Sequence, residues 1–189
     1  VMGAFNGWNK TAHELHPAGQ SGIWETFVPR VRPGDTYKYH VVSRHQGTAA
    51  DKADPFAFHA ETPPRNASIV WNLDYEWGDR EWMASRAARN SLNAPISIYE
   101  LHFGSWRRVT EDNNRWLTYR EMAPKLADYV EQMGFTHVEF LPLTEHTFYG
   151  SWGYQTTGYF APTSRYGTPQ DLMYLIDYLH QHEIAVILD

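Results

Sequence analysis

The pattern of hydrophobic and polar positions changes character near residue 84. Before it, apolar and aromatic residues form short runs that alternate with polar residues and are separated by turn sequences. After it, apolar strand-like runs alternate with longer segments of helical period. The pattern therefore predicts a multidomain chain, with one domain at residues 1–83, a connecting helix and loop at 84–95, and a second domain at 96–189.

Residues 1–83 are predicted to form an all-β, immunoglobulin-like sandwich. Strands are expected at residues 23–28, 37–42 and 68–71, separated by turn sequences such as Asn6-Gly7 and Pro33-Gly34-Asp35. In residues 37–41, aromatic rings and an aliphatic side chain alternate with polar residues, as in a half-buried antiparallel strand. Short strands with frequent turns are typical of a sandwich.

Two tryptophans of this part, Trp8 and Trp24, have two interpretations. Each ring could stack on a sugar or hold the sandwich together. We expect Trp24 to pack in the core, and for Trp8 both interpretations stay open.

Residues 96–189 predict a parallel sheet. Strands are expected at 96–101, 137–142 and 184–188, with a helix in each of the two connections. This alternation implies right-handed crossovers between parallel strands, as in the first strand-helix-strand-helix-strand units of a TIM (β/α)8 barrel. Three strands with two open edges are not a finished fold, so we expect further strands beyond Asp189.

The two predicted helices have clear boundary signals. Thr118 and Glu121 form a capping box for the first, which Gly134 closes, and Thr168 caps the second. Pro124 falls inside the first pattern, where it removes a backbone hydrogen bond. Either this helix begins late or it kinks at Pro124.

Composition and charge narrow the classes of ligand. Aromatic residues make up 15% of the chain, with eight Trp and twelve Tyr. Aromatic rings with polar atoms suit sugars, whose apolar faces stack and whose hydroxyls form hydrogen bonds. For most of these rings, however, we favour packing inside the β-sandwich. A net charge of -6 argues against nucleic acid or an anionic membrane as partner.

Other chemistries are excluded by composition. The chain has no cysteine, which rules out disulfides, thiol catalysis and thiolate metal sites and fits a reducing cytoplasm. No uninterrupted apolar run is long enough to span a bilayer. The histidine pairs His13 with His16 and His180 with His182 have no third ligand at metal-binding spacing, so we expect surface histidines and no metal site.

The connection at residues 143–167, between the second strand and its helix, is the candidate functional segment. It is long, and it leaves the carboxyl end of a strand, where barrel enzymes have their sites. It contains Trp152, Tyr154 and Gln155 among several aromatic residues. Glu145 and His146 are adjacent in sequence, and the side chains of adjacent residues rarely converge on one atom as an acid–base pair. We therefore expect them to stabilise the loop. Glu100 and His102, at the end of the first strand, are expected to support these loops.

Several motifs in order resemble one family. Residues 97–106 read Ser-Ile-Tyr-Glu-Leu-His-Phe-Gly-Ser-Trp, residues 134–142 Gly-Phe-Thr-His-Val-Glu-Phe-Leu-Pro, residues 152–155 Trp-Gly-Tyr-Gln, and residues 164–172 Ser-Arg-Tyr-Gly-Thr-Pro-Gln-Asp-Leu. This set resembles bacterial glycogen branching enzymes of the α-amylase superfamily. Phe5-Asn-Gly-Trp8 and Asp54-Pro-Phe-Ala57 resemble the glycogen-binding (CBM48-like) module that precedes their barrel.

The resemblance implies cleavage of an α-1,4-glucan and transfer to a 6-hydroxyl, forming an α-1,6 branch with retained configuration. Retention requires two carboxyl groups, which in this family come from later barrel strands, so no catalytic residue is expected in this chain and the pair should lie beyond Asp189. Tyr154 matches the family's sugar-stacking tyrosine, with Trp152 and Gln155 beside it, and Asp189 matches an aspartate that orients neighbouring groups. The resemblance implies α-glucan as partner, no cofactor, and a monomer.

Two alternative functions stay open. One is a debranching or trehalose-forming hydrolase of the same superfamily, and the other is a non-catalytic glucan-binding module. The block at residues 101–106 favours branching over debranching, and the barrel start after residue 95 argues against a free-standing module.

Overall fold

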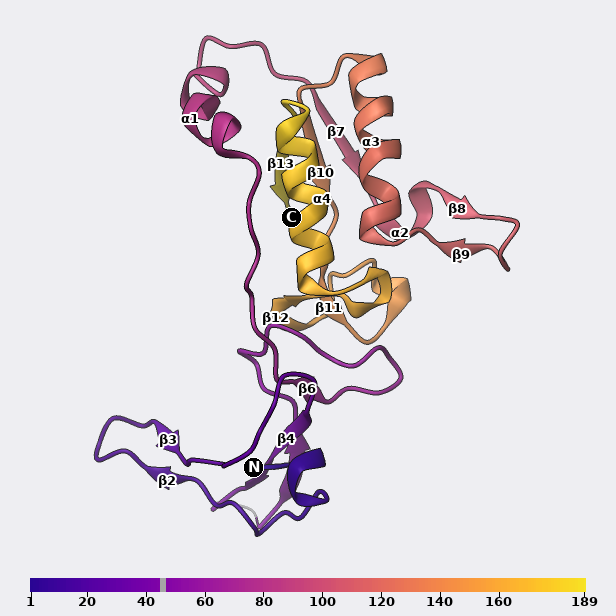
Figure 1. Ribbon diagram of the computed structural model, residues 1–189. Coiled ribbons are helices and arrows are strands. Elements are labelled where there is room, and N and C mark those ends of the chain that lie inside the picture. Colours follow the sequence, from indigo (N-terminus) through magenta and orange to yellow (C-terminus); the bar gives the residue numbers. More distant parts are fainter. Residues whose placement is uncertain (45–46) are drawn as a thin grey trace.

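The computed structural model describes residues 1–44 and 47–189. The molecule has two parts, which an extended segment joins along one side (Figure 1). The N-terminal part consists of short strands and loops, and the second part of helices against a parallel sheet. In the described part of the chain, no helix combines the length and the apolar character needed to cross a membrane.

The N-terminal sheet is organised around β4 (Thr36–Val42). This strand pairs antiparallel with β1 (Met2–Gly3), β5 (Ala49–Lys52) and β6 (Ser68–Ile69). A single-turn 3-10 helix, Ala4–Asn6, follows β1. The strand predicted at residues 37–42 and its antiparallel pairing are confirmed.

The second layer expected for a sandwich is a small hairpin. It consists of β2 (His16–Pro17) and β3 (Trp24–Glu25), which pair with each other and project from the sheet (Figure 1). The strand expected at residues 23–28 is therefore too long. The expectation that Trp24 packs in a core is wrong, because this residue of the hairpin is 52% exposed.

The second part contains the predicted parallel sheet. Its strands are β7 (Ile98–Leu101), β10 (His137–Phe140) and β13 (Ala185–Leu188), in the order β13-β10-β7. Both pairings are parallel, with His137 opposite Ile98 on one side and Ala185 on the other. The predicted order and direction of the three strands are confirmed.

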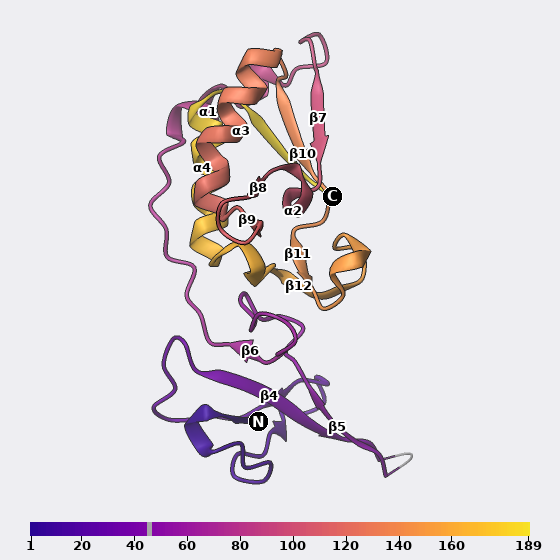
Figure 2. The same ribbon diagram turned by 90° about the vertical axis from the view of Figure 1, so that its right-hand side faces the viewer.

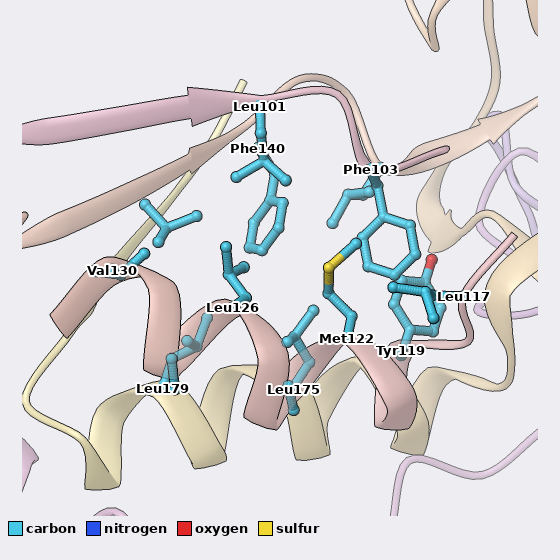
Figure 3. Close-up of a cluster of buried hydrophobic side chains, with 14 of the residues drawn as sticks. Leu101, Phe103, Leu117, Tyr119, Met122, Leu126, Val130, Phe140, Leu175 and Leu179 are labelled. Carbon is cyan, nitrogen blue, oxygen red and sulfur yellow. The ribbon is translucent and has the colours of Figure 1, made fainter. Parts of the chain in front are cut away.

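Both crossover helices cover the same face of this sheet. Figure 2 shows α3 (Tyr119–Met133) and α4 (Pro169–Gln181) together on one side of the strands. Leu101 and Phe140 point from the sheet into the layer between strands and helices, where Leu126 and Leu175 meet them (Figure 3). The alternation along β7 and β10 turns Glu100 and Glu139 to the opposite face, which neither helix covers.

The ends of both helices follow from local sequence. Thr118 and Glu121 form the expected capping box of α3, and Gly134 closes the helix in the left-handed conformation, with φ 74°. The helix begins at its cap and runs through Pro124, so the alternative of a late start is wrong. A capping box of Thr168 and Asp171 begins α4.

The connection between the two parts runs along α4. The Trp71 indole N–H donates to Gln170 Oε1 at 2.8 Å, and the Gly78 N–H and the Tyr75 hydroxyl both donate to the buried carboxylate of Asp177. The aromatic rings of Phe56 and Phe160 stack at 5.5 Å, which adds a contact between the N-terminal part and the second part.

The connecting helix α1 (Arg80–Arg89) begins before residue 84, where we expected it to start. Asp79 precedes this helix, and its carboxylate lies 2.8 Å from Nδ1 of His180. The Trp82 ring stacks on the same imidazole at 5.2 Å. His180 is therefore largely buried, and its expected place on the surface is wrong. Through these contacts the start of α1 packs against α4. Hydrophobic periodicity does not predict them, because they join segments about 100 positions apart.

Short elements complete the second part. A four-residue helix, α2 (Phe103–Trp106), follows β7, and β8 (Arg108–Val109) pairs with β9 (Arg115–Trp116) as a hairpin before α3. Phe103 is buried against Tyr119 and Phe140, so α2 closes one end of the core (Figure 3).

Replacement of a core leucine should destabilise the chain. Leu126 is fully buried between α3 and the sheet, so Leu126→Ala should lower the free energy of unfolding by about 2–5 kcal/mol. Leu92 is fully exposed, and Leu92→Ala should change it by less than about 0.5 kcal/mol. Urea unfolding followed by tryptophan fluorescence measures both. Equal effects of the two substitutions would contradict this core.

Candidate functional site

The segment at residues 143–167 is a structured hairpin. It consists of β11 (Thr144–His146) and β12 (Thr156–Pro162), which pair antiparallel with irregular register. The 3-10 helices Tyr149–Ser151 and Ser164–Tyr166 lie between these strands and after β12. The hairpin leaves the carboxyl end of β10 and lies below the sheet in Figure 1.

A buried ion pair holds the two ends of this segment together. The side chains of Glu145 and Arg165 are each 5% exposed, and Nη1 of Arg165 lies 3.1 Å from Oε1 of Glu145. The other carboxylate oxygen accepts hydrogen bonds from the backbone N–H and the hydroxyl of Ser164, each at 2.8 Å. Arg165 also donates to the carbonyl oxygens of His146 and Thr147. The loop-stabilising role expected for Glu145 is confirmed.

Two of the predicted site residues meet at the end of the sheet. The Tyr154 hydroxyl donates a hydrogen bond to Oδ2 of Asp189 at 2.6 Å, although 35 positions separate them in sequence. The backbone N–H of Asp189 donates to the carbonyl of Phe140, which continues the pairing of β13 with β10. The Tyr154 side chain is 58% exposed, so its ring is available to a ligand.

Acidic groups surround this tyrosine. The hydrogen bond to Asp189 is the main cause that raises the pKa of Tyr154 to about 12, and the negative charges of Glu100 and Glu139 act in the same direction. Glu100 and Glu139 are opposite each other in the pairing of β7 with β10. Glu139 was not among the residues predicted for the site. The two-residue period of its strand would have placed it on the face of Glu100.

Trp152 is fixed beside Tyr154 by an aromatic stack and a tight turn. Its ring stacks on the His102 imidazole at 5.3 Å with an interplanar angle of 19°. Its backbone has φ 57°, and Gly153 follows with φ 94°. A β-carbon at residue 153 would come 2.3 Å from the carbonyl oxygen of Pro142, so only glycine fits there. His102 thus supports the loop, as expected.

The arrangement around His102 favours its neutral form. Burial is the main cause that lowers the pKa of His102, and nearby His146 acts in the same direction. The Nδ1 atom of His102 lies 2.8 Å from the Ser105 hydroxyl. Gln155 is exposed and has no side-chain hydrogen bond within residues 1–44 and 47–189, so the structure gives it no partner.

Trp8, the candidate of the N-terminal part, lies far from Tyr154 in sequence and on the other part of the molecule. It borders a hollow of about 350 Å³, together with Lys38, Asp51 and Asn66. The Trp8 ring is 41% exposed, and Lys38 donates to Asn66 Oδ1 at 2.6 Å. An exposed indole beside fixed amide and ammonium groups can stack on a sugar and bond its hydroxyls.

The comparisons with known proteins first define a class. Residues 1–57 match the family of carbohydrate-binding module 48 (isoamylase N-terminal domain). The crystal structure of an alpha-amylase-family protein from Salmonella typhimurium superposes with a TM-score of 0.70 at 28% sequence identity, covering 93% of this chain and 27% of that one. Residues 1–57 are thus similar to a carbohydrate-binding module, and nearly the whole chain is similar in fold to an alpha-amylase-family protein.

More specific matches extend along the whole chain. It is 56% identical to the 1,4-alpha-glucan branching enzyme GlgB of Albidiferax ferrireducens and 58% identical to that of Aquifex aeolicus, in each case over 100% of this chain. The chain spans 30% of the length of these relatives. The resemblance to branching enzymes that its sequence motifs indicate is confirmed.

Removal of the Asp189 charge should lower the pKa of Tyr154. Asp189→Asn keeps the site's size but removes the carboxylate that disfavours the tyrosinate, so the pKa should fall from about 12 toward its ordinary value of about 10. NMR titration of the tyrosine ring carbons measures this change. Glu14→Gln, at an exposed position of the N-terminal part, should leave it unchanged. An unchanged pKa in Asp189→Asn would contradict the hydrogen bond.

Proposed function

We propose that this chain forms part of a 1,4-α-glucan branching enzyme, a hexosyltransferase that cleaves α-1,4-glucan and transfers the chain to a 6-hydroxyl. The observation that carries the proposal is the identity of 56–58% over the full chain to proteins of that name. The hydrogen bond between Tyr154 and Asp189 supports the proposal, because two different sequence motifs select these residues and the fold brings them into contact.

The second part is proposed to begin a TIM barrel. Three parallel strands with both helices on one face are the arrangement in which the helices lie outside and the uncovered face points to the barrel interior. Within residues 1–44 and 47–189, β7 and β13 are the unpaired edges of this sheet, which further strands would pair. On this basis we divide the chain into a carbohydrate-binding module at 1–83, a connection at 84–95 and the barrel start at 96–189.

Tyr154, Trp152, Gln155 and Asp189 are proposed to bind the glucan beside the cleaved bond. In this assignment the exposed Tyr154 ring stacks on a sugar, and Asp189 fixes the tyrosine's orientation through its hydroxyl. The stack of Trp152 on His102 limits how far the loop moves. The catalytic carboxylate pair is proposed to lie outside these residues, so the 189-residue chain alone should give no turnover.

Trp8 is proposed to bind glucan in the module, with Lys38 and Asn66 as polar partners. An oligosaccharide would stack on the indole and exchange hydrogen bonds with the two side chains. We further propose that the protein is a monomer and acts on glucan in the cytoplasm. The names of the two relatives described above disfavour the alternative of a debranching hydrolase.

Substitution of Trp8 should weaken glucan binding by the chain. Trp8→Ala removes the stacking surface and should raise the Kd for maltoheptaose about tenfold, which corresponds to about 1.4 kcal/mol. Trp24→Ala is the matched control, because Trp24 is 52% exposed in the same part but lies outside the hollow. Calorimetric titration compares the two. Equal losses in both variants would remove the assignment of Trp8.

A chimeric enzyme tests the proposed function itself. These 189 residues should replace the matching region of the Aquifex aeolicus enzyme and retain amylose branching, measured by iodine staining and by α-1,6 linkages in NMR. Tyr154→Ala in the chimera should lower kcat at least about tenfold without lowering Tm, since it removes transition-state stabilisation. Tyr159→Ala, on the same hairpin and 72% exposed, is the control.

A folded chimera that does not branch amylose would contradict the proposed function. If Tyr154→Ala lost activity only together with thermal stability, or if Tyr159→Ala had the same effect, the role of Tyr154 at the site would be wrong.

A further inference from the structure

A second hollow of the N-terminal part has a different chemical character from the Trp8 hollow. Its volume is about 430 Å³, and the two hollows share no lining residue. The lining includes two arginines and a histidine beside apolar surface: Phe5, His13, Pro29, Arg30, Arg32 and Asp35. In a chain of net charge -6, this is a local concentration of cationic and donor groups.

Both arginine side chains are free to bind an anion. Within residues 1–44 and 47–189, neither Arg30 nor Arg32 forms an ion pair or a side-chain hydrogen bond, and both are exposed. The guanidinium group presents several N–H donors in one plane, which match two oxygens of a phosphate. Two unpaired guanidinium groups bordering one hollow therefore favour a ligand with a phosphate.

The backbone at Arg30 is unfavourable for an arginine. Arg30 follows Pro29 and has φ 64°, the left-handed region. A turn with proline followed by a residue of positive φ normally takes glycine or asparagine at the second position. Arginine there costs free energy, and side-chain chemistry is one reason to retain such a residue.

The hydrogen bonds of Asn6 indicate which ring nitrogen of neutral His13 carries the proton. Asn6 Oδ1 accepts from the Gly3 N–H at 2.9 Å, so the Asn6 amide nitrogen is the atom that lies 3.0 Å from Nδ1 of His13. In neutral His13, Nδ1 is thus the acceptor and Nε2 carries the proton. That Nε2–H has no partner in the described part of the chain and can donate to an anion.

The remaining lining is suited to a sugar. The Phe5 ring offers an apolar face, and the ring of His13 packs edge-on against it at 6.1 Å. Oδ2 of Asp35 accepts a hydrogen bond from the backbone N–H of Arg32 at 2.8 Å, while its Oδ1 has no partner within the described residues. A carboxylate oxygen repels a second anion but accepts hydroxyl hydrogens, so a ligand with one phosphate and several hydroxyls fits better than a bare anion.

We propose that this hollow binds a sugar phosphate, with the phosphate monoester on Arg30, Arg32 and Nε2 of His13 and the sugar against Phe5 and Asp35. The volume exceeds that of a phosphate alone, which leaves room for the sugar ring. The monoester could belong to a free hexose phosphate or to a phosphorylated glucose unit of a glucan. This binding is independent of the branching activity, because the hollow shares no residue with the Trp8 hollow or with the pair Tyr154 and Asp189.

NMR titration of the 15N-labelled chain tests the site. Glucose 6-phosphate should produce saturable shifts at the amides of Arg30 and Arg32 and at the His13 ring, with weaker binding of inorganic phosphate and none of neutral maltose. A phosphorylated maltooligosaccharide forms a parallel arm. The tighter of the two esters identifies the source of the phosphate.

Arg30→Gly is the most informative variant. Glycine suits the positive φ, so Tm should be kept or raised while the Kd for glucose 6-phosphate rises at least about tenfold. Arg32→Gln should weaken binding too, whereas Arg86→Gln, at an exposed position of α1, should not. The proposal is overturned if neither ester gives saturable shifts at millimolar concentration, if Arg30→Gly binds as the unaltered chain does, or if maltose binds equally well.

Discussion

The buried ion pair between Glu145 and Arg165 is the interaction on which the arrangement of the candidate site depends. Burying two charges costs several kcal/mol per ion, and only further hydrogen bonds make the arrangement favourable. Here each ion has such bonds. Ser164 donates two hydrogen bonds to the carboxylate, and the guanidinium donates to two backbone carbonyls. Because the pair ties the start of the hairpin to its end, it determines where the intervening Tyr154 lies relative to the sheet.

The same pair influences the contact between the two parts. His59 of the N-terminal part is buried, and its ring packs against Trp71 at 4.6 Å. Burial lowers the pKa of His59, and the negative charge of Glu145 opposes this effect without outweighing it. A neutral His59 is compatible with a carboxylate that Arg165 already satisfies. The N-terminal part therefore packs beside the hairpin without adding a third charge to the buried ion pair.

The parts of the fold that sequence predicted well rest on local signals. The strands and capping boxes of the second part follow from alternation and from side chains three residues apart, as at Thr118 and Glu121. Trp24 could not be placed in this way, because its burial depended on a second layer that is only a hairpin here. The contacts of Gln170 and Asp177 escaped prediction for another reason. Polar residues on a helix normally face solvent, and only the path of a distant segment shows otherwise.

For the candidate site, sequence motifs selected Tyr154 and Asp189 but could not show that they touch. Their hydrogen bond arises because β13 ends beside β10 and the hairpin returns beneath both strands. Glu139 was missed although alternation alone places it beside Glu100. A loop-stabilising role was predicted for Glu145, but its partner Arg165 was not. Arg165 lies twenty positions away and reaches Glu145 only because the hairpin folds back.

The contacts of the connecting segment with α4 have a consequence for how the length of the chain can vary. Three residues of α4 form hydrogen bonds with three residues of this segment in the same order: Gln170 with Trp71, Asp177 with Gly78, and His180 with Asp79. Seven positions separate the first two residues of α4, and three separate the last two. One inserted residue between 71 and 78 would displace Gly78 and Asp79 by about 3.4 Å, more than a hydrogen bond tolerates. Insertions and deletions should thus be excluded from this stretch, whereas the tip of the projecting β2–β3 hairpin can accept them at little cost.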